Sequence, residues 1–241
     1  MMKKSKKLKR DDWQKLLILV LVISLIAVVI YIFNPVEIID REKAVSIYSS
    51  EHDGYIYEDD TASSLKTAWN TVIDDDDGTS DKTGNIYIGA RTDGGNTTRY
   101  RARIYRGFLI FDTTAITGTV NTVSLRIYVE DLYTQQDYDL IVQIDDDFVY
   151  PHIPLDNDDY DQGQYDGDYG SIDADDITEN SYCTITLDPD VINKGGWTKL
   201  CLRNSRDIND ARLASNKKAY IVIASGDDDD TAKYPMLLIN A

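Results

Sequence analysis

The sequence predicts an all-β fold, a two-sheet antiparallel β-sandwich of the jelly-roll type, preceded by a single transmembrane helix. Three observations lead to this prediction. Past residue 44 the apolar residues alternate with polar ones, as in half-buried strands. Clusters of Gly, Asn, Asp and Pro separate the alternating runs, as turns would. One long apolar run without a charge stands near the N-terminus, at residues 16–33.

The net charge of -17 is divided unevenly along the 241 residues. The first 33 residues carry seven basic and two acidic side chains, a balance of +5. The other 208 residues carry 18 basic and 40 acidic side chains, a balance of -22. A chain this acidic repels phosphate groups, so nucleic acid is excluded as a partner.

The apolar run at 16–33 predicts an uncleaved signal anchor. Its 18 residues span about 27 Å as a helix, close to the thickness of a bilayer's hydrocarbon core. The basic segment 1–15 then lies in the cytoplasm, because basic residues stay on that side of a membrane. Residues 34–43 form a stalk, and 44–241 form an extracellular domain on a plasma or envelope membrane. A cleaved signal peptide is the alternative, but residues 30–35 lack small residues of the A-x-A kind.

The outer part predicts ten strands in order along the chain. In 122–130, for example, Val123, Leu125 and Ile127 share one face, with polar residues opposite. The predicted strands are 44–49, 54–58, 85–89, 102–112, 122–130, 138–144, 181–187, 197–203, 219–225 and 234–239. A short helix is expected around 63–72 and a single helical turn at 189–194.

Four short motifs of this chain resemble segments of a known family and follow one another in the same order. Residues 105–113 (YRGFLIFDT), followed by 123–128 (VSLRIY), resemble the core "R-x-L-L-x-F-D-T-S" strand pair of DNRLRE-type jelly rolls, which are similar to carbohydrate-binding modules. Residues 49–55, 197–207 and 234–239 resemble the opening, late and closing strands of the same family. The resemblance covers about 45–241. It implies a β-sandwich used for binding or structure, and no catalytic residues.

Asp112 ends the predicted strand 102–112, and the residues favour a structural role for it. Leu109 and Phe111 point to one side of that strand and are expected in the core. A carboxylate at a strand end can accept the N–H groups of the following turn.

Aspartate makes up 36 of the 42 acidic residues, which raises the question of calcium. Runs at 74–77, 145–147 and 227–230 are more typical of solvated loops. The segment 156–176 is the stronger candidate, although its spacing excludes an EF-hand. The predicted Ca²⁺ ligands, all oxygen donors, are Asn157, Asp159, Asp161, Asp166 and Asp168. Salt adaptation is the alternative cause of the acidity.

The two cysteines, Cys183 and Cys201, lie on neighbouring predicted strands, where a disulfide is conceivable in an oxidising compartment. Their side chains, however, are expected on different faces relative to the apolar residues beside them. Asn96 begins the N-x-[ST] sequence Asn96-Thr97-Thr98, which a suitable host could glycosylate.

No catalytic motif stands in the sequence. It contains no G-x-S-x-G, H-E-x-x-H or P-loop pattern, and His52 and His152 are expected in loops. The chain is therefore predicted not to be an enzyme.

Two functions remain. The first is an anchored domain that binds surface glycans or another extracellular partner, stabilised by calcium. Tyrosines on loops or on a sheet face would stack on sugar rings. The candidates are Tyr133 and Tyr150, and above all Tyr160, Tyr165 and Tyr169. The alternative is a structural cell-envelope or virion surface protein that assembles laterally. The oligomeric state is left open by the sequence.

Overall fold

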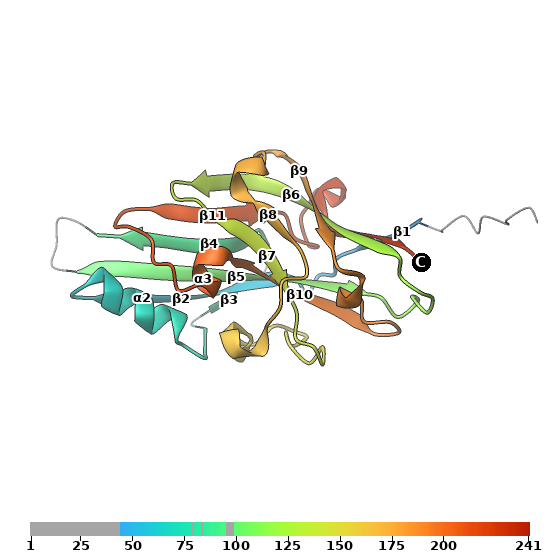
Figure 1. Cartoon of the computed structure of the whole chain (residues 1–241), viewed down its shortest axis with the longest axis horizontal. Helices are drawn as coiled ribbons and strands as arrows, with labels where there is room; N and C mark the ends of the chain where they lie inside the picture. The colour runs from blue at the N-terminus through green and yellow to red at the C-terminus, as the bar shows by residue number, and fades with distance from the viewer. Residues whose placement is uncertain (1–43, 79, 83, 95–98) are drawn as a thin grey trace, which may run out of the picture. The chain divides into compact units, whose positions relative to one another are not determined.

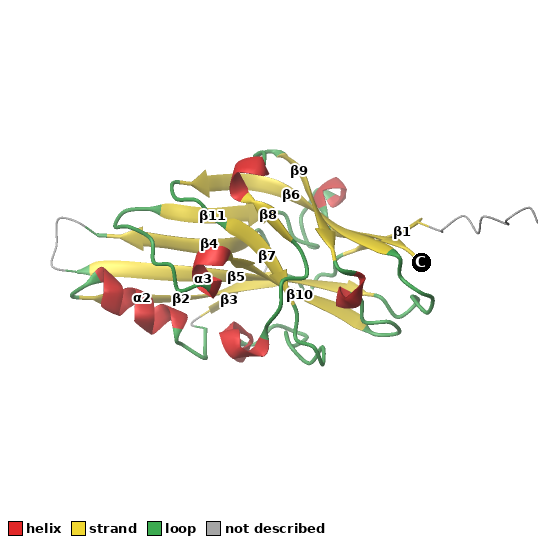
Figure 2. Cartoon of the chain, in the orientation of Figure 1, coloured by secondary structure: helices red, strands yellow, loops and turns green. Residues whose placement is uncertain are grey.

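Antiparallel strands dominate the computed structural model, which describes residues 44–78, 80–82, 84–94 and 99–241 (Figure 1). The strands are β1 (Ala44–Tyr48), β2 (Gly54–Ala62), β3 (Ser80–Lys82), β4 (Ile86–Asp93), β5 (Tyr100–Asp112), β6 (Thr122–Thr134), β7 (Asp139–Gln143), β8 (Ser171–Asp173), β9 (Ser181–Leu187), β10 (Trp197–Asn204), β11 (Lys218–Ile223) and β12 (Met236–Asn240). Two short α-helices, α2 (Leu65–Ile73) and α3 (Ser205–Ile208), and several 3₁₀ turns connect them (Figure 2).

The ten strands predicted from the sequence are confirmed, as are the helix near 63–72 and the turn near 189–194. The β3 and β8 strands were not predicted. Each has only three residues, too few for an alternating pattern to be recognised.

The sheet branches next to β5, and this gives the domain its β-sandwich-like form. The first half of β5 pairs with β4, through Tyr105 and Gly89, and the second half pairs with β10, from Gly107 onward. One branch continues from β4 through β11 to β6, and the other runs from β10 through β7 to β8. Strand β2 pairs with the opposite edge of β5 and belongs to both branches.

Two glycines, Gly89 and Gly107, lie where the β4 branch and the β10 branch diverge along β5. Gly89 has φ of 128°, and a Cβ there would lie 2.4 Å from the carbonyl oxygen of Ala219. A Cβ on Gly107 would lie 2.5 Å from Cγ1 of Ile88, which packs over β5 from the β4 branch. Both positions therefore require glycine for a close approach of backbone or side chain.

The main core fills the space between the two branches. The β4 branch contributes Ile88 and Ile221, and the other layer contributes Leu109, Phe111 and Leu200, all fully buried. The expectation that Leu109 and Phe111 form a core pair is confirmed.

A second core lies on the other side of β2 and β5, under α2 (Figure 1). Helix α2 begins after Ser64, whose side chain accepts a hydrogen bond from the backbone N–H of Thr67. Its Trp69 and Val72 are buried against Ile56 and Ile104 of the strands below. The loop before β8 completes the cover with Tyr160 and Tyr165.

A buried ion network ties this cover to the sheet. Both guanidinium groups of Arg106 and Arg203 donate to the carboxylate of Asp207, with N–O distances of 2.7–2.9 Å. Arg106 also donates to the carbonyl oxygen of Tyr160 and stacks on its ring. The side chains of Arg106, Arg203 and Asp207 are at most 3% exposed, so each charge depends on the others for compensation.

The two cysteines are free and buried in different cores. Cys183 lies in the main core and Cys201 in the second core, on the other side of the sheet. The expectation that they face different ways is confirmed, and it leaves no geometry for a disulfide.

Several predictions concern residues outside those that the structure describes. These are the basic segment 1–15, the anchor at 16–33, the stalk through residue 43 and the sequon at Asn96. Among the described residues, no helix is both long enough and apolar enough to span a bilayer.

Candidate binding face

A row of tyrosines crosses the sheet on its outer face. Tyr57 of β2 stands directly opposite Tyr105 of β5, and Tyr105 stands opposite Gly89 of β4. The row continues from Gly89 to Tyr220 of β11, and from Tyr220 to Tyr133 of β6. Side chains of directly paired residues lie on the same face, so the row forms a single strip across five strands.

Ring contacts join this row to two further tyrosines. The centroids of Tyr133 and Tyr220 are 4.5 Å apart, and those of Tyr105 and Tyr220 are 5.9 Å apart across the side-chain-free Gly89. We call the connected set of six rings the tyrosine face; it consists of Tyr55, Tyr57, Tyr87, Tyr105, Tyr133 and Tyr220.

The strand pattern explains why tyrosine occupies this face. Tyr87 lies between the core residues Ile86 and Ile88, and Tyr220 precedes the core residue Ile221. Successive strand residues point to opposite sides, so each buried isoleucine directs its neighbouring tyrosine outward. Tyr105 and Tyr220 form the floor at 5% and 6% exposure, while the other four rings are partly exposed.

Cations stand in register beside the tyrosine row. Arg103 of β5 is paired with Arg91 of β4, and Arg91 is paired with Lys218 of β11. The guanidinium carbon of Arg103 lies 4.5 Å from the centroid of Tyr57. The ammonium of Lys218 lies 4.6 Å from the centroid of Tyr133. These cation–π contacts hold the charges against the rings.

Two tyrosines of this face, Tyr55 and Tyr220, remain neutral at physiological pH. Burial, together with Tyr87 and Tyr105, raises the pKa of Tyr55 to about 12. Burial and the neighbouring Tyr133 also raise the pKa of Tyr220. Each ring therefore keeps a phenol hydroxyl that can both donate and accept hydrogen bonds. Flat apolar rings carrying such hydroxyls suit the faces and hydroxyl groups of sugars.

The tyrosines predicted as ligand-binding residues lie elsewhere, apart from Tyr133. Tyr160 is fully buried and its hydroxyl donates to the carbonyl of Val72, 3.0 Å away. Tyr165 is 4% exposed and donates to the carbonyl of Asp159. Their burial leaves neither ring open to a sugar, which corrects the expectation that they sit on the loop surface. Tyr169 is partly exposed and bonds to Asp146, and Tyr150 packs partly against the second core.

The predicted calcium ligands do not converge, because their carboxylates mostly serve the local backbone. Asp161 accepts from the N–H of Gly163, and Asp168 accepts from the N–H of Gly170. Asp166 forms an isolated backbone bridge with Ile144, and the backbone carbonyl of Asn157 accepts from Gly78. Only Asp159 of the set belongs to a group of side chains suited to a metal.

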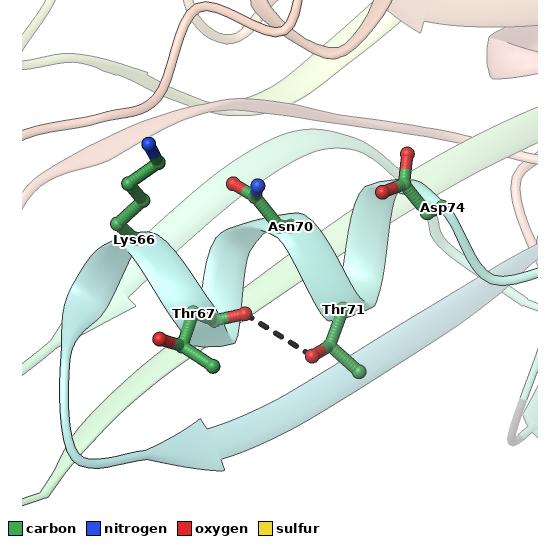
Figure 3. A pocket seen from close by; sticks show the side chains of 5 residues that line it. All are labelled: Lys66, Thr67, Asn70, Thr71 and Asp74. Carbon is green, nitrogen blue, oxygen red and sulfur yellow. Dashed lines mark hydrogen bonds between the residues drawn. The ribbon is translucent and has the colours of Figure 1, made fainter.

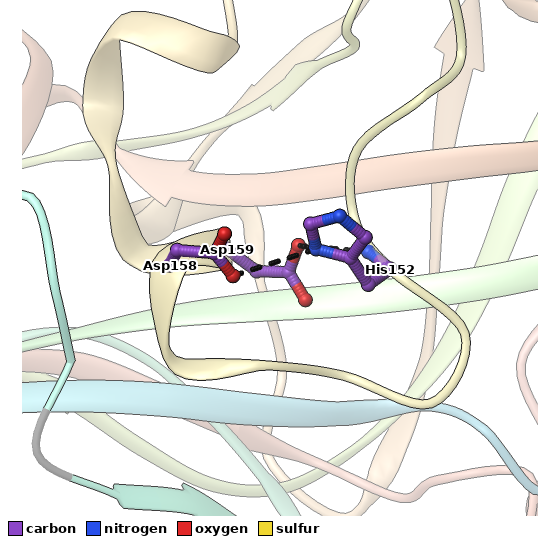
Figure 4. A group of neighbouring side chains, drawn as sticks. All are labelled: His152, Asp158 and Asp159. Carbon is purple, nitrogen blue, oxygen red and sulfur yellow. Dashed lines mark hydrogen bonds and ion pairs between the residues drawn. The ribbon is translucent and has the colours of Figure 1, made fainter.

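That group consists of His152, Asp158 and Asp159 (Figure 4). Nδ1 of His152 lies 2.9 Å from Oδ1 of Asp159 and 3.5 Å from Oδ1 of Asp158. Asp159 is fully buried and already accepts from the backbone N–H groups of His152 and Asp156. Burial raises its pKa, against the effect of these hydrogen bonds. The imidazole nitrogen suits zinc or another transition metal, whereas calcium takes oxygen donors, which here are the carboxylates of Asp158 and Asp159.

The outer flank of α2 carries a hollow of about 390 Å³ (Figure 3). Its lining consists of Lys66, Thr67, Asn70, Thr71 and Asp74. The hydroxyl of Thr71 donates to the carbonyl of Thr67 on the same helix, 3.1 Å away. Four of these residues lie on successive turns of α2, and Asp74 directly follows the helix. Their functional groups do not point to a common centre.

The structural role predicted for Asp112 is confirmed. One oxygen of its exposed carboxylate accepts from both the N–H and the hydroxyl of Thr114. These hydrogen bonds lower the pKa of Asp112.

Sequence reasoning missed most of the tyrosine face, although part of its signal was present. The alternation of tyrosine with isoleucine, as in Tyr55-Ile56-Tyr57 and Ile86-Tyr87-Ile88, indicates an aromatic outer face. The pairing that aligns these tyrosines depends on strands far apart in the sequence.

The chain has no match among known protein-family models, and no curated protein sequence matches it.

Proposed function

We propose that this chain is a membrane-anchored surface protein whose outer domain binds glycans through the tyrosine face. The observation that carries the proposal is the unbroken set of ring contacts across five strands, on a face where four of the rings are partly exposed. Aromatic platforms of this kind bury sugar faces while their hydroxyls bond to sugar hydroxyls.

The finer features of the proposal rest on the sequence. The apolar run at 16–33 and its basic flank support a signal anchor with the N-terminus in the cytoplasm. The order of the four short motifs supports a DNRLRE-like jelly roll. A non-catalytic role agrees with a sequence that carries no nucleophile or metalloprotease motif.

Calcium stabilisation stays part of the proposal, and the carboxylates of Asp158 and Asp159, in the group they form with His152, are the oxygen donors that would hold the cation. Their ligand atoms lie within 4.8 Å of one another, which is the closest approach to a coordination site in the described part of the chain.

The glycan proposal is tested by replacing rings on the tyrosine face of the full-length protein in detergent. Binding to a panel of neutral and charged polysaccharides is measured for the wild type and for Tyr57→Ala and Tyr133→Ala. We expect both substitutions to weaken binding about tenfold, since a stacked ring contributes about 0.5–1.5 kcal/mol beyond its buried area.

Tyr182→Ala is the matched control. Tyr182 lies on β9, contacts one other tyrosine and has Arg126 at 3.8 Å from its centroid, but it is outside the tyrosine face. Two outcomes would contradict a glycan site on the tyrosine face. One is binding that is unchanged in Tyr57→Ala and Tyr133→Ala, and the other is an equal loss of binding in Tyr182→Ala. Unchanged melting temperatures establish that the variants remain folded.

Lateral assembly is the second candidate function, and an edge strand favours it. Among the described residues, β1 pairs only with β12, so its other edge is open. Tyr48 is 53% exposed on β1, and Leu238 of β12, which pairs with Ser46 two residues earlier, is 37% exposed. Open edges of this kind can pair with another copy. Concentration-dependent oligomers that Tyr48→Lys disperses would support assembly, and a monomer at all concentrations would exclude it.

A further inference from the structure

We infer that the glycan bound by the tyrosine face is anionic, carrying carboxylate or sulfate groups that the row Arg103–Arg91–Lys218 recognises. This inference rests on the proposed function and adds the class of ligand to it.

The first support is the register of the three cations. Arg103, Arg91 and Lys218 stand on three adjacent strands, each directly opposite the next. Directly paired strands are about 4.8 Å apart, so the three charges are close neighbours. Like charges placed opposite each other destabilise a sheet. Asp59 of β2, directly opposite Arg103, offsets part of this repulsion, and an anion bound beside Arg91 and Lys218 would relieve the rest.

The second support is the contrast between this face and the rest of the domain. Residues 44–241 hold 16 Lys and Arg side chains against 37 Asp and Glu. On and beside the tyrosine face the balance reverses, with Arg91, Arg101, Arg103 and Lys218 against Asp59, Asp93 and Asp131. A surface that stays cationic on a strongly acidic domain attracts an anionic ligand to that surface.

The third support is the hydrogen-bonding capacity that the arginines retain. Asp59 accepts from both Arg101 and Arg103, and Asp93 lies 3.4 Å from Arg91. The Nε atoms of Arg91 and Arg103 are buried and closed to a ligand, so the donors left for an anion are the terminal nitrogens of Arg91 and the ammonium of Lys218. A planar guanidinium offers several donors in a fork that matches a carboxylate or sulfate.

The tyrosine row and the cation row are two residues apart along the same strands. Tyr105 and Arg103 lie on one side of β5, and Tyr220 and Lys218 lie on one side of β11. Two residues of a strand span about 6.6 Å, which is about the width of a sugar ring and its substituent. A sugar stacked on the tyrosines would therefore direct a carboxylate or sulfate toward the cations.

The test compares four probes on the full-length protein by titration: heparin, polygalacturonate, neutral dextran and inorganic polyphosphate. Heparin carries sulfate and carboxylate, and polygalacturonate carries carboxylate alone, so the two separate the sources of charge. We expect at least one of them to bind about tenfold or more tightly than dextran, with binding that weakens as salt is added.

Arg91→Gln and Lys218→Gln are expected to weaken the anionic glycan about tenfold each, as loss of a charge-assisted hydrogen bond would. Both should weaken the binding of dextran less than that of the anionic glycan. Lys194→Gln is the control, because Lys194 is exposed on the β9–β10 connection, away from the row. It should leave all four probes unaffected.

The outcomes separate this inference from the proposed function. Dextran binding as tight as that of the anionic glycans, lost in Tyr133→Ala but kept in Arg91→Gln, would overturn the anionic class and leave the glycan site standing. Polyphosphate binding as tight as heparin, unaffected by Tyr133→Ala, would overturn both in favour of a general polyanion surface. No binding to any probe would also overturn both.

Discussion

Asp207 is the residue on which the second core depends most. Its carboxylate lies between Arg106 and Arg203, and all three side chains are buried. Burial alone would raise the pKa of Asp207, but the two guanidinium groups hold it well below its usual range. The ionised carboxylate therefore stabilises the fold above about pH 4, and this contribution is lost as the pH falls below that value.

We expect Asp207→Asn to lower the free energy of unfolding by about 3–5 kcal/mol, because two buried cations would lose their counter-charge. Urea unfolding at pH 7 measures the change. Asp112→Asn is the control, since the exposed Asp112 bonds only to Thr114 in its own turn. Equal effects of the two substitutions would contradict the role assigned to Asp207.

The pKa of Asp53, which joins three segments of the chain, is shifted in the opposite direction to that of Asp207. Its carboxyl accepts from the N–H groups of Ile110 and Gly226, which joins the turn before β2 to β5 and to the loop after β11. Burial raises the pKa of Asp53 to about 8. The protonated form is therefore favoured in the folded state, and its stabilisation is complete below about pH 4 and lost as the pH rises to about 8.

Asp53→Asn should flatten the dependence of the melting temperature on pH between about 4 and 8. The asparagine cannot ionise, although it also exchanges one accepting oxygen for a donor and lowers stability at every pH. Thermal melts across this range check the prediction. A wild-type and a variant curve that run parallel would show that Asp53 does not titrate there.

At the scale of elements, the loop between β7 and β8 is the place to look for a cation. Asp158 is half exposed beside His152, while Asp159 is buried. We expect millimolar Ca²⁺ to raise the melting temperature of the wild type, because a cation that binds only the folded state stabilises it. Asp158→Asn should reduce the shift.

A NaCl series at matched ionic strength is the control for this measurement. Equal stabilisation by NaCl and CaCl₂ would favour salt adaptation over a calcium site. Identical melting temperatures with Ca²⁺ and with EDTA would exclude calcium from the account.

The positions of the strands and of α2 were predicted better from the sequence than the pairing of the strands or the burial of loop residues. Ten strands and α2 follow from local alternation and from turn residues, which are properties of neighbouring positions. The branch at Gly89 and Gly107 could not be predicted, because it depends on which strand each half of β5 pairs with. Burial of Tyr160 and Tyr165 was missed for a similar reason: the polar loop around them folds back over β5.

For the domain as a whole, the same branching produces both the core and the tyrosine face. The inner sides of the branches enclose the isoleucines and leucines, and the outer side of β4 and β11 carries the tyrosines continuous with those of β2 and β5. Register between strands that are distant in the sequence aligns the tyrosine row and the cation row. The cation row therefore differs in charge from the strongly acidic domain that carries it.

A crystal structure of the protein with a short anionic oligosaccharide is the most direct test of an anionic glycan site on the tyrosine face. We expect sugar rings stacked on Tyr57 or Tyr133 of the tyrosine face, with a carboxylate or sulfate oxygen within about 3 Å of Arg91. An oligosaccharide bound at the loop that carries Tyr150 and Tyr169, with the tyrosine face empty, would contradict it.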